Sequence, residues 1–324
     1  MSDCPAISVI LPNYNSGQYV EACISSIEAQ SFSDYEVIVG DSGSTDGSLE
    51  ALVEYSERDP RVRIIHLPKE GIYPAWNQCL RQAVGEFIYI ATADDYISEG
   101  LLAGLIGAFE RDTSCDVTFS RLVWVGEDGV EDHDKWFGLE SVSSGSFLDI
   151  ASKRGMMSSQ YRAFLYGPFV ISMNQMLVRR GVYEEIGFYP ETVGSGGDLL
   201  WTFRAFSIAK VFYVDRGYAA WRIHPGQATS IDTRKQQAVN WLCRKCYYEE
   251  CTNDVALGLS YYMAYHRVKG FFRGDTSCLH GLTWRDFRSF FSVAAFALKT
   301  HGFSRKQGGM GLRRYIETRN KFLS

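Results

Sequence analysis

The 324-residue sequence contains no apolar run long enough to cross a lipid bilayer. A membrane-spanning helix needs about 20 consecutive apolar residues, and the nearest candidate, residues 290–298, covers less than half of that length. No signal peptide precedes the first predicted strand. We therefore expect a cytoplasmic protein that is either soluble or peripheral at the inner face of a membrane.

The sequence also lacks the patterns of two other protein classes. Its formal net charge is -5, whereas nucleic-acid-binding domains are usually basic, so we expect no nucleic-acid partner. Of the eight cysteines only Cys243 and Cys246 form a Cys-x-x-Cys pair; Cys251 lies nearby, and no His stands at zinc-finger spacing. We expect free thiols here, with the pair on a helix, rather than a zinc site or a disulfide framework.

Short apolar runs alternate with helical patterns over the first hundred residues, which predicts an α/β fold with parallel strands. The expected strands are residues 7–11, 35–39, 62–67 and 87–91. The expected helices are residues 20–27, a helix from 48, and residues 75–84 and 98–110. Ligands bind beyond the carboxyl ends of such strands. Asp41 and Asp94 follow the second and fourth strands, so we expect them to converge although 53 positions separate them.

Further along the chain the pattern is less regular. Asp128-Gly129 predicts a hairpin turn. Strands are expected at residues 117–125, 211–214 and 218–223, and helices at 181–186 and 199–207. Residues 141–175 stay unassigned and are a candidate lining for an acceptor site.

The charge changes sign toward the C-terminus. Residues 261–324 contain twelve Lys or Arg and three acids, a formal charge of +9, which leaves -14 on residues 1–260. Aromatic side chains lie among these cations, a composition suited to an anionic membrane surface. A packed helical extension with a solvated basic face explains the same composition, so both interpretations stay open. We expect one domain over residues 1–235, divided near residue 125, and a helical basic extension over residues 236–324.

Five segments, in the order in which they occur, resemble the motifs of a family-2 glycosyltransferase with the GT-A fold. They are ISVILPNYN, YEVIVGDSGSTDGS, GIYPAWNQCLRQAVGEFIYIATADD, GFYPETVGSGGDLLWTFRA and WRIHPGQATS. The resemblance covers roughly residues 6–230 and implies a mixed, mostly parallel sheet flanked by helices. It also implies an inverting enzyme that transfers a sugar from a nucleotide-diphosphate sugar, with UDP favoured, to a hydroxyl of a glycan or lipid-linked glycan.

The resemblance places a divalent cation, Mn²⁺ or Mg²⁺, beside the leaving diphosphate, where it acts as a Lewis acid. In the family an Asp-x-Asp triplet after the fourth strand supplies the metal ligand. Here the triplet is Thr92-Ala93-Asp94, so Asp94 remains and the first acid is missing. Thr92 would bond the ribose or a metal-bound water. His224 would complete the metal shell and Arg222 would pair with the diphosphate. Capping of the following helix by Asp94 and Asp95 is the alternative.

The same resemblance assigns the nucleoside site. Pro12, Asn13 and Tyr14 match the loop that covers the base. Asp41 matches the acid that contacts the nucleoside, where a carboxylate accepts hydrogen bonds from the base or the ribose. Asn77 falls on a position near the donor, and a role in helix packing is an equal alternative.

Inversion requires one general base to deprotonate the acceptor hydroxyl during attack on the anomeric carbon. The family places this carboxylate just before an apolar helix that carries an Arg, and Asp198 matches it. The neighbouring acid usual in the family is Gly197 in this chain. Capping of the helix by Asp198 is an alternative that is compatible with the catalytic role.

Two other functions are open on the sequence alone. The first is a non-catalytic relative that binds nucleotide-sugars or glycans, which Thr92 in place of an acid would explain. A nucleotidyltransferase would share the nucleotide-binding sheet, but that class usually has a cationic loop after its first strand. Residues 11–19 contain no Lys or Arg, so this function ranks last.

Overall fold

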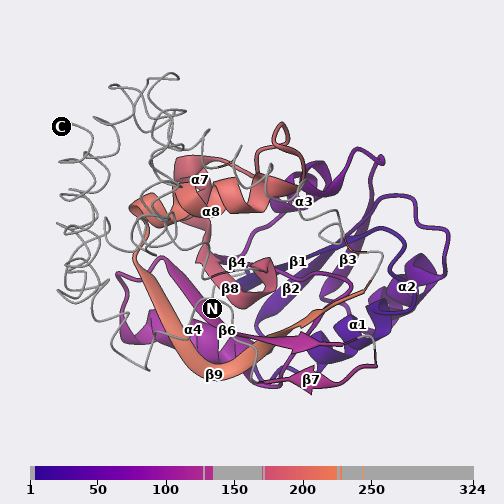
Figure 1. Cartoon of the computed structure of the whole chain (residues 1–324), viewed down its shortest axis with the longest axis horizontal. Helices are drawn as coiled ribbons and strands as arrows, with labels where there is room; N and C mark the ends of the chain where they lie inside the picture. The colour runs from indigo at the N-terminus through magenta and orange to yellow at the C-terminus, as the bar shows by residue number, and fades with distance from the viewer. Residues whose placement is uncertain are drawn as a thin grey trace, which may run out of the picture. The chain divides into compact units, whose positions relative to one another are not determined.

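The computed structural model describes residues 4–126, 128–133, 170, 172–224, 227 and 243 (Figure 1). The chain divides into two compact units, Met1–Val239 and Asn240–Ser324, and the fold below is that of the first. The domain boundary predicted at residue 235 and the helical, basic character predicted for residues 236–324 lie outside the described residues, apart from the buried Cys243. Most of the unassigned segment 141–175 lies outside them as well.

The first unit is built on one mixed sheet, nine-stranded within the described residues. Its first half, in the order β3-β2-β1-β4, is parallel and consists of β1 (Ile7–Asn13), β2 (Tyr35–Asp41), β3 (Val62–His66) and β4 (Phe87–Ile90). The sheet continues with β8 (Met176–Arg179), β6 (Val117–Val125), β9 (Val211–Arg222) and β5 (Tyr96–Ile97), and β7 (Glu131–Asp132) pairs with β6. Most of the paired residues belong to parallel ladders, so the predicted mixed, mostly parallel sheet is confirmed.

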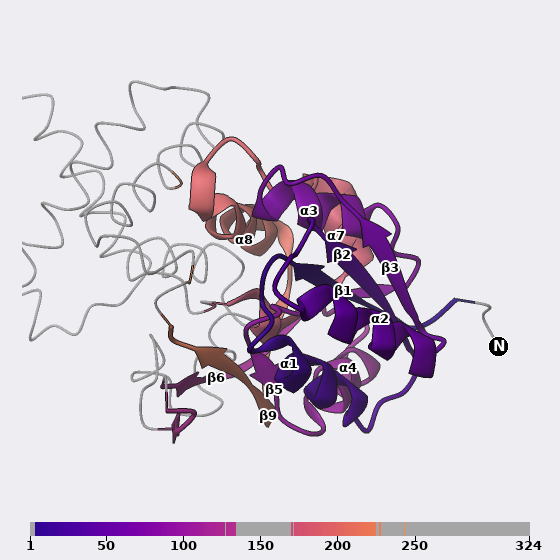
Figure 2. The same ribbon diagram turned by 90° about the vertical axis from the view of Figure 1, so that its right-hand side faces the viewer.

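Helices cover both faces of this sheet (Figures 1 and 2). One layer consists of α1 (Val20–Glu28), α2 (Ser48–Arg58) and α4 (Leu101–Arg111). The opposite layer consists of α3 (Ile72–Leu80), α7 (Arg180–Ile186) and α8 (Gly197–Ile208). Two 3-10 turns, Met173–Gln175 and Gly194–Gly196, precede β8 and α8.

The periodicity of the sequence explains the two layers. In α1 the buried residues Val20, Cys23, Ile24 and Ile27 recur at helical spacing, and they share a core cluster with alternate residues of β1. Ile10, on the other face of β1, is also fully buried, as expected for a strand covered on both sides. No helix among the described residues is long and apolar enough to cross a membrane.

Two features of the strands differ from the prediction, and two further predictions are confirmed. The expected strands 211–214 and 218–223 are one strand, β9, whose register against β6 shifts between Ser120 and Arg121. The short strands β5 and β8 were not expected. The hairpin at Asp128-Gly129 is confirmed, because the Gly126 amide donates to the Val130 carbonyl at 3.0 Å. Cys23, Cys79 and Cys115 are buried free thiols, as expected.

Helix α4 packs closely on the bend of β9, and its two interior glycines form a matched pair for testing this contact. A Cβ atom on Gly104 would lie 2.7 Å from the Arg216 carbonyl oxygen, whereas a Cβ on Gly107 meets nothing within 4 Å. We predict that Gly104→Ala lowers the free energy of unfolding by about 1–3 kcal/mol through overpacking. Gly107→Ala should instead raise it by up to about 1 kcal/mol through helix propensity. Thermal unfolding followed by circular dichroism measures both, and equal shifts would contradict the close packing.

Candidate functional site

The candidate site residues lie at the carboxyl edge of the parallel strands. Strand β1 lies between β2 and β4, and the register pairs Asn13 with Asp41 and Ile10 with Ile90. Since neighbouring strands are about 4.8 Å apart, the axes of β2 and β4 are separated by about 10 Å. Asp41 ends β2 and Asp94 follows β4 by four residues, so both stand at this edge, as the sequence predicted.

Asp94 and His224 face each other across 130 positions of sequence. The distance from Asp94 Oδ2 to His224 Nε2 is 3.2 Å, and the side chains are 33% and 12% exposed. Arg222 joins the same corner, because its Nε donates to the Asp94 carbonyl oxygen at 3.2 Å. The structure thus brings together three residues that the sequence had placed at the diphosphate and the metal.

The Asp94–His224 pair has a geometry that fits a divalent cation. Two adjacent ligands of an octahedral ion, each about 2.1 Å from it, lie about 3 Å apart, close to the observed separation. A carboxylate with an imidazole suits Mn²⁺, and Mg²⁺ would rely more on the carboxylate. Among the described residues there is no group of three or more potential ligands. Diphosphate oxygens and water would therefore have to complete such a shell.

Asp95, for which the sequence offered only helix capping, holds this corner together through buried hydrogen bonds. Its carboxyl is buried and accepts three hydrogen bonds, from the Thr92 hydroxyl, from Asn174 Nδ2 at 3.1 Å and from the Arg222 amide at 2.8 Å. Burial, followed by the charge of Asp94, raises the pKa of Asp95 well above its usual value. Asp95 therefore ties the end of β4 to β9 and to the turn before β8. The Thr92 hydroxyl is engaged in this contact; its predicted donor role stays a prediction.

Tyr19, at the start of α1, contacts both residues of the Arg-x-His motif. Its ring lies 4.6 Å from the His224 ring, centroid to centroid, and 5.1 Å from the Arg222 guanidinium carbon. The guanidinium also lies 5.7 Å from the Tyr96 ring. Aromatic faces attract such a cation, so the two tyrosines orient Arg222 without neutralising it. No sequence motif marks Tyr19, because the contact depends on how α1 and β9 meet.

A second group forms around Asp41, which is buried. Its Oδ1 accepts Asn13 Nδ2 at 2.8 Å and the Ser44 hydroxyl at 2.6 Å, and its Oδ2 accepts the amides of Gly43 and Ser44 at 3.0 and 3.2 Å. A carboxylate offers about four lone-pair positions, so the protein already uses all of them. In this structure Asp41 holds the loop after β2. A nucleoside contact stays a prediction, and it requires that one of these donors be displaced.

The loop after β1 presents an open aromatic surface beside this group. Pro12 is partly buried within β1 and Asn13 is buried, whereas the Tyr14 ring is 44% exposed. Lys69 Nζ lies 4.1 Å from the centre of the Tyr14 ring. Of the three residues predicted to cover a base, Tyr14 is therefore the one with an accessible face.

Asn77 lies on α3 and is fully engaged with the segment after α7. Its Nδ2 donates to the Tyr189 carbonyl at 2.9 Å and to Glu191 Oε1 at 2.8 Å, and its Oδ1 accepts the Tyr189 amide at 3.0 Å. The side chain is 2% exposed. The geometry matches the packing alternative, and a donor contact by Asn77 stays a prediction.

Asp198 lies in the first turn of α8, beside the start of α3. Its Oδ1 accepts the Leu199 amide at 2.7 Å and the Tyr73 hydroxyl at 3.0 Å, and no other described residue donates to its Oδ2. Burial raises the pKa of Asp198, and these two donors and the backbone amide of Asp198 itself oppose the rise. A partly buried carboxylate with one oxygen anchored and the other open has the form of a proton acceptor.

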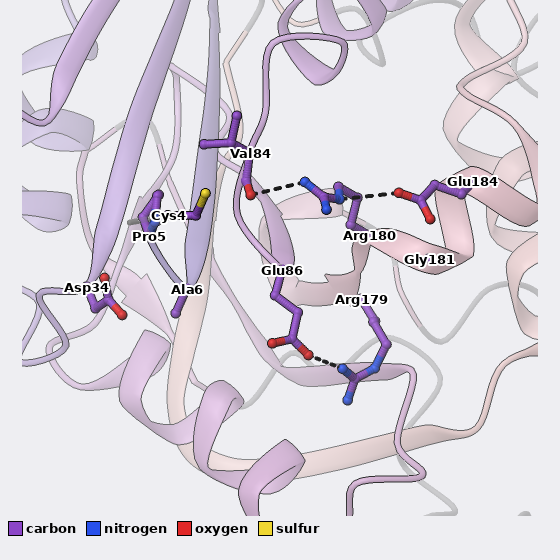
Figure 3. A pocket seen from close by; sticks show the side chains of 10 residues that line it. All are labelled: Cys4, Pro5, Ala6, Asp34, Val84, Glu86, Arg179, Arg180, Gly181 and Glu184. Atoms are coloured by element: carbon purple, nitrogen blue, oxygen red, sulfur yellow. Dashed lines mark hydrogen bonds and ion pairs between the residues drawn. The ribbon is translucent and has the colours of Figure 1, made fainter. Parts of the chain in front are cut away.

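A cavity of about 530 Å³ lies at the opposite edge of the sheet (Figure 3). Ala6, Asp34 and Glu86, which precede β1, β2 and β4, contribute to its lining, together with Arg179 and Arg180. Arg179 pairs with Glu86, and Arg180 donates to the Val84 carbonyl and pairs with Glu184. Both arginines are paired within the wall, and the cavity shares no residue with the carboxyl edge described above.

The raised pKa of Asp198 predicts a pH-dependent cost in stability. Between the unfolded and the folded pKa the folded state binds more protons, so the wild type loses stability as the pH rises through that window. Asp198→Asn keeps an oxygen for both donors and has no charge. Its melting temperature relative to wild type should therefore increase from pH 4 to pH 8, measured by differential scanning fluorimetry.

Asp34→Asn, which alters an exposed carboxyl, is the control. Its melting temperature relative to wild type should change little with pH. A difference for Asp198→Asn that is constant across the same range would contradict the burial cost.

Known proteins resemble this chain in sequence and in fold. The model of the family "Glycosyl transferase family 2" matches residues 8–187. The glycosyltransferase EpsJ of Bacillus subtilis, itself described as uncharacterized, is 36% identical over 107 residues, which is 33% of this chain and 31% of that protein. Glycosyltransferase GlyA of Streptococcus pneumoniae is 25% identical over 233 residues, 71% of this chain and 32% of that protein. The chain thus spans about a third of the length of these curated relatives.

Solved structures share the fold at low sequence identity. S. aureus TarS (residues 1–349, in complex with UDP-GlcNAc) has a TM-score of 0.56 at 21% identity, covering 91% of this chain and 81% of that one. The mannosyltransferase PcManGT of Pyrobaculum calidifontis, in complex with GDP-Man and Mn²⁺, has a TM-score of 0.54 at 16% identity, covering 95% and 85%. Because the family model matches more than half of the sequence, the chain belongs to glycosyl transferase family 2.

Proposed function

We propose that this protein is an inverting glycosyltransferase that moves a sugar from a UDP-sugar to a hydroxyl of a glycan or lipid-linked glycan. The observation that carries the proposal is the Asp94–His224 pair at the carboxyl edge, 3.2 Å apart and beside Arg222. This pair and Arg222 suit a metal-bound diphosphate. The anchored carboxylate of Asp198 supplies the base that a binding protein has no need of.

The donor is proposed from chemistry and from the structural neighbours. TarS was solved with UDP and with UDP-GlcNAc, and PcManGT with GDP-Man and Mn²⁺. UDP is preferred because TarS is the more similar of the two in sequence and in TM-score. The exposed Tyr14 ring offers a stacking surface for the base, next to the Asn13–Asp41 pair.

In this proposal Asp94 and His224 hold a divalent cation against the diphosphate. The cation, when bound, supplies Lewis-acid stabilisation of the negative charge that develops on the leaving group. Arg222 lies in the same corner, with its guanidinium oriented by Tyr19 and Tyr96, and it adds a second positive charge. Charge that is fixed in place before the reaction costs no reorganisation during it.

Asp198 is proposed to take the proton of the acceptor hydroxyl on its open Oδ2. The acceptor oxygen then forms a bond to the anomeric carbon, the bond from that carbon to the diphosphate breaks, and the configuration inverts. The raised pKa of Asp198 brings the carboxylate closer to the pH at which it works, which makes it a stronger base than an exposed Asp. The identity of the acceptor and a membrane contact through residues 236–324 remain expectations from the sequence.

Nucleotide binding should depend on the Asp94–His224 pair. We predict that UDP raises the melting temperature more with Mn²⁺ than without it, and more than GDP or dTDP does, because a ligand at 100 times its Kd adds about 2.7 kcal/mol to the folded state. Asp94→Ala and His224→Ala should each remove the part of the shift that requires Mn²⁺.

Asp128→Ala, which alters an exposed acid in the β6–β7 turn, is the matched control and should keep the full shift. A folded wild type that shows no shift with any nucleotide would favour the non-catalytic alternative, with Thr92 as the decisive departure from the family pattern.

Turnover should depend on Asp198 while donor binding does not. We predict that Asp198→Asn lowers the release of UDP from UDP-GlcNAc, with water or a glycan as acceptor, by about 10²–10⁴-fold, the usual contribution of a general base. The UDP-induced thermal shift should stay near that of the wild type. Retained turnover in Asp198→Asn would remove this residue as the base.

A further inference from the structure

The absence of a side chain at Gly197 has a structural cause. A Cβ atom at this position would lie 2.5 Å from the Pro190 carbonyl oxygen and 2.7 Å from both Cδ2 and Cε2 of the Tyr73 ring. No other residue fits there unless the backbone or the ring moves. The space next to Asp198, where the resemblance places a second acid, is therefore filled by Tyr73.

The Tyr73 ring is itself held firmly. It is 4% exposed, and it packs edge-on against Trp76 at a centroid distance of 5.5 Å and nearly parallel to Tyr189 at 6.0 Å. Its hydroxyl reaches two acceptors, the Ser195 carbonyl oxygen at 2.9 Å and Asp198 Oδ1 at 3.0 Å. Tyr73 thus links α3 to the first turn of α8 at the residue proposed as the base.

We infer that Tyr73 is the positioning residue of Asp198, fixing Oδ1 so that Oδ2 is presented to the acceptor hydroxyl. The inference rests on the proposed function for the role of Asp198, and on the contacts above for the role of Tyr73. Gly197 and Tyr73 act as a pair, since the ring occupies its place only while position 197 has no side chain.

The hydroxyl of Tyr73 carries one proton and faces two acceptors, so its hydrogen bond responds to the charge on Asp198. While Asp198 is a carboxylate, the charge-assisted bond to Oδ1 is the stronger one. When Asp198 takes up a proton, the Ser195 carbonyl becomes the competing acceptor. The contact therefore stabilises the charged base more than the protonated form, and it lowers a pKa that burial raises.

A titration of Asp198 tests the inference without requiring turnover. In protein labelled with ¹³C at the aspartate carboxyl carbons, the Asp198 signal is the one that is lost in Asp198→Asn. The titratable groups that face Asp198 from the described elements packed on it are the phenols of Tyr73 and Tyr189. We expect Tyr73→Phe, which keeps the ring and removes the hydroxyl, to raise the pKa of Asp198.

Tyr183→Phe is the matched control. Tyr183 is buried in the same aromatic cluster, stacks on Trp201 and hydrogen-bonds the Tyr189 hydroxyl at 3.0 Å, without a contact to Asp198. The pKa of Asp198 should be nearly unchanged in this variant. An unchanged pKa in Tyr73→Phe, or an equal rise in both variants, would overturn the inference.

Turnover separates this inference from the proposed function. For UDP release from UDP-GlcNAc with Mn²⁺, Tyr73→Phe should lower kcat about tenfold and leave KM for the donor near the wild-type value. It should also move the acidic limb of the pH profile to higher pH. Tyr183→Phe should leave that limb in place. If Asp198→Asn keeps its turnover while Tyr73→Phe still raises the pKa, the proposed base fails and the Tyr73 contact stands.

Discussion

The buried carboxyl of Asp95 is the constraint on which the corner formed by Asp94, Arg222 and His224 depends. It accepts bonds from Thr92, Asn174 and the Arg222 amide, which come from the end of β4, the turn before β8 and the end of β9. Leaving a buried carboxyl without hydrogen-bond partners costs free energy. The three segments are therefore held in the positions from which their donors reach Asp95. Asp94 and Arg222 are direct neighbours of these bonds along the chain, and His224 follows Arg222 by two residues. The buried hydrogen bonds of Asp95 thus position the more exposed side chain of Asp94, its neighbour in the chain.

Most of the fold follows from the sequence because its strands are continuous apolar runs and its helices have a clear apolar face. Residues 7–11 and 87–91 could be assigned in this way, and so could the placement of Asp41 and Asp94 at one edge of the sheet. The two-residue strand β5 and the strand β8 have no such signal; they form because β9 and β6 offer them partners. Asp95 was missed because burial, and not a pattern, distinguishes it from Asp94. Tyr19 and Tyr73 were missed because their contacts join segments that only the fold brings together.

The departures from the family pattern have local physical reasons. Thr92 replaces an acid, and its hydroxyl donates to Asp95, which a carboxylate in the same place could not do without a proton. A second acid beside Asp94 and Asp95 would also add a like charge to a pair of carboxyls in which burial already raises the pKa of one member. Gly197 replaces an acid because the Tyr73 ring and the Pro190 carbonyl occupy the space. Thr92 therefore suits its neighbour Asp95, and Gly197 suits its neighbour Tyr73. In both cases the remaining carboxylate, Asp94 or Asp198, stays in place.

The two carboxylates differ because their surroundings differ. Asp94 is a third exposed and has an imidazole and a guanidinium as neighbours. Among the described residues, the hydrogen-bond donors to Asp198 are amides and a phenol, so burial dominates and its pKa is raised. A higher proton affinity suits the role of base proposed for Asp198. The fold gives one residue type two different surroundings, by ending β4 near the Arg222 end of β9 and by packing the start of α8 against the aromatic residues of α3.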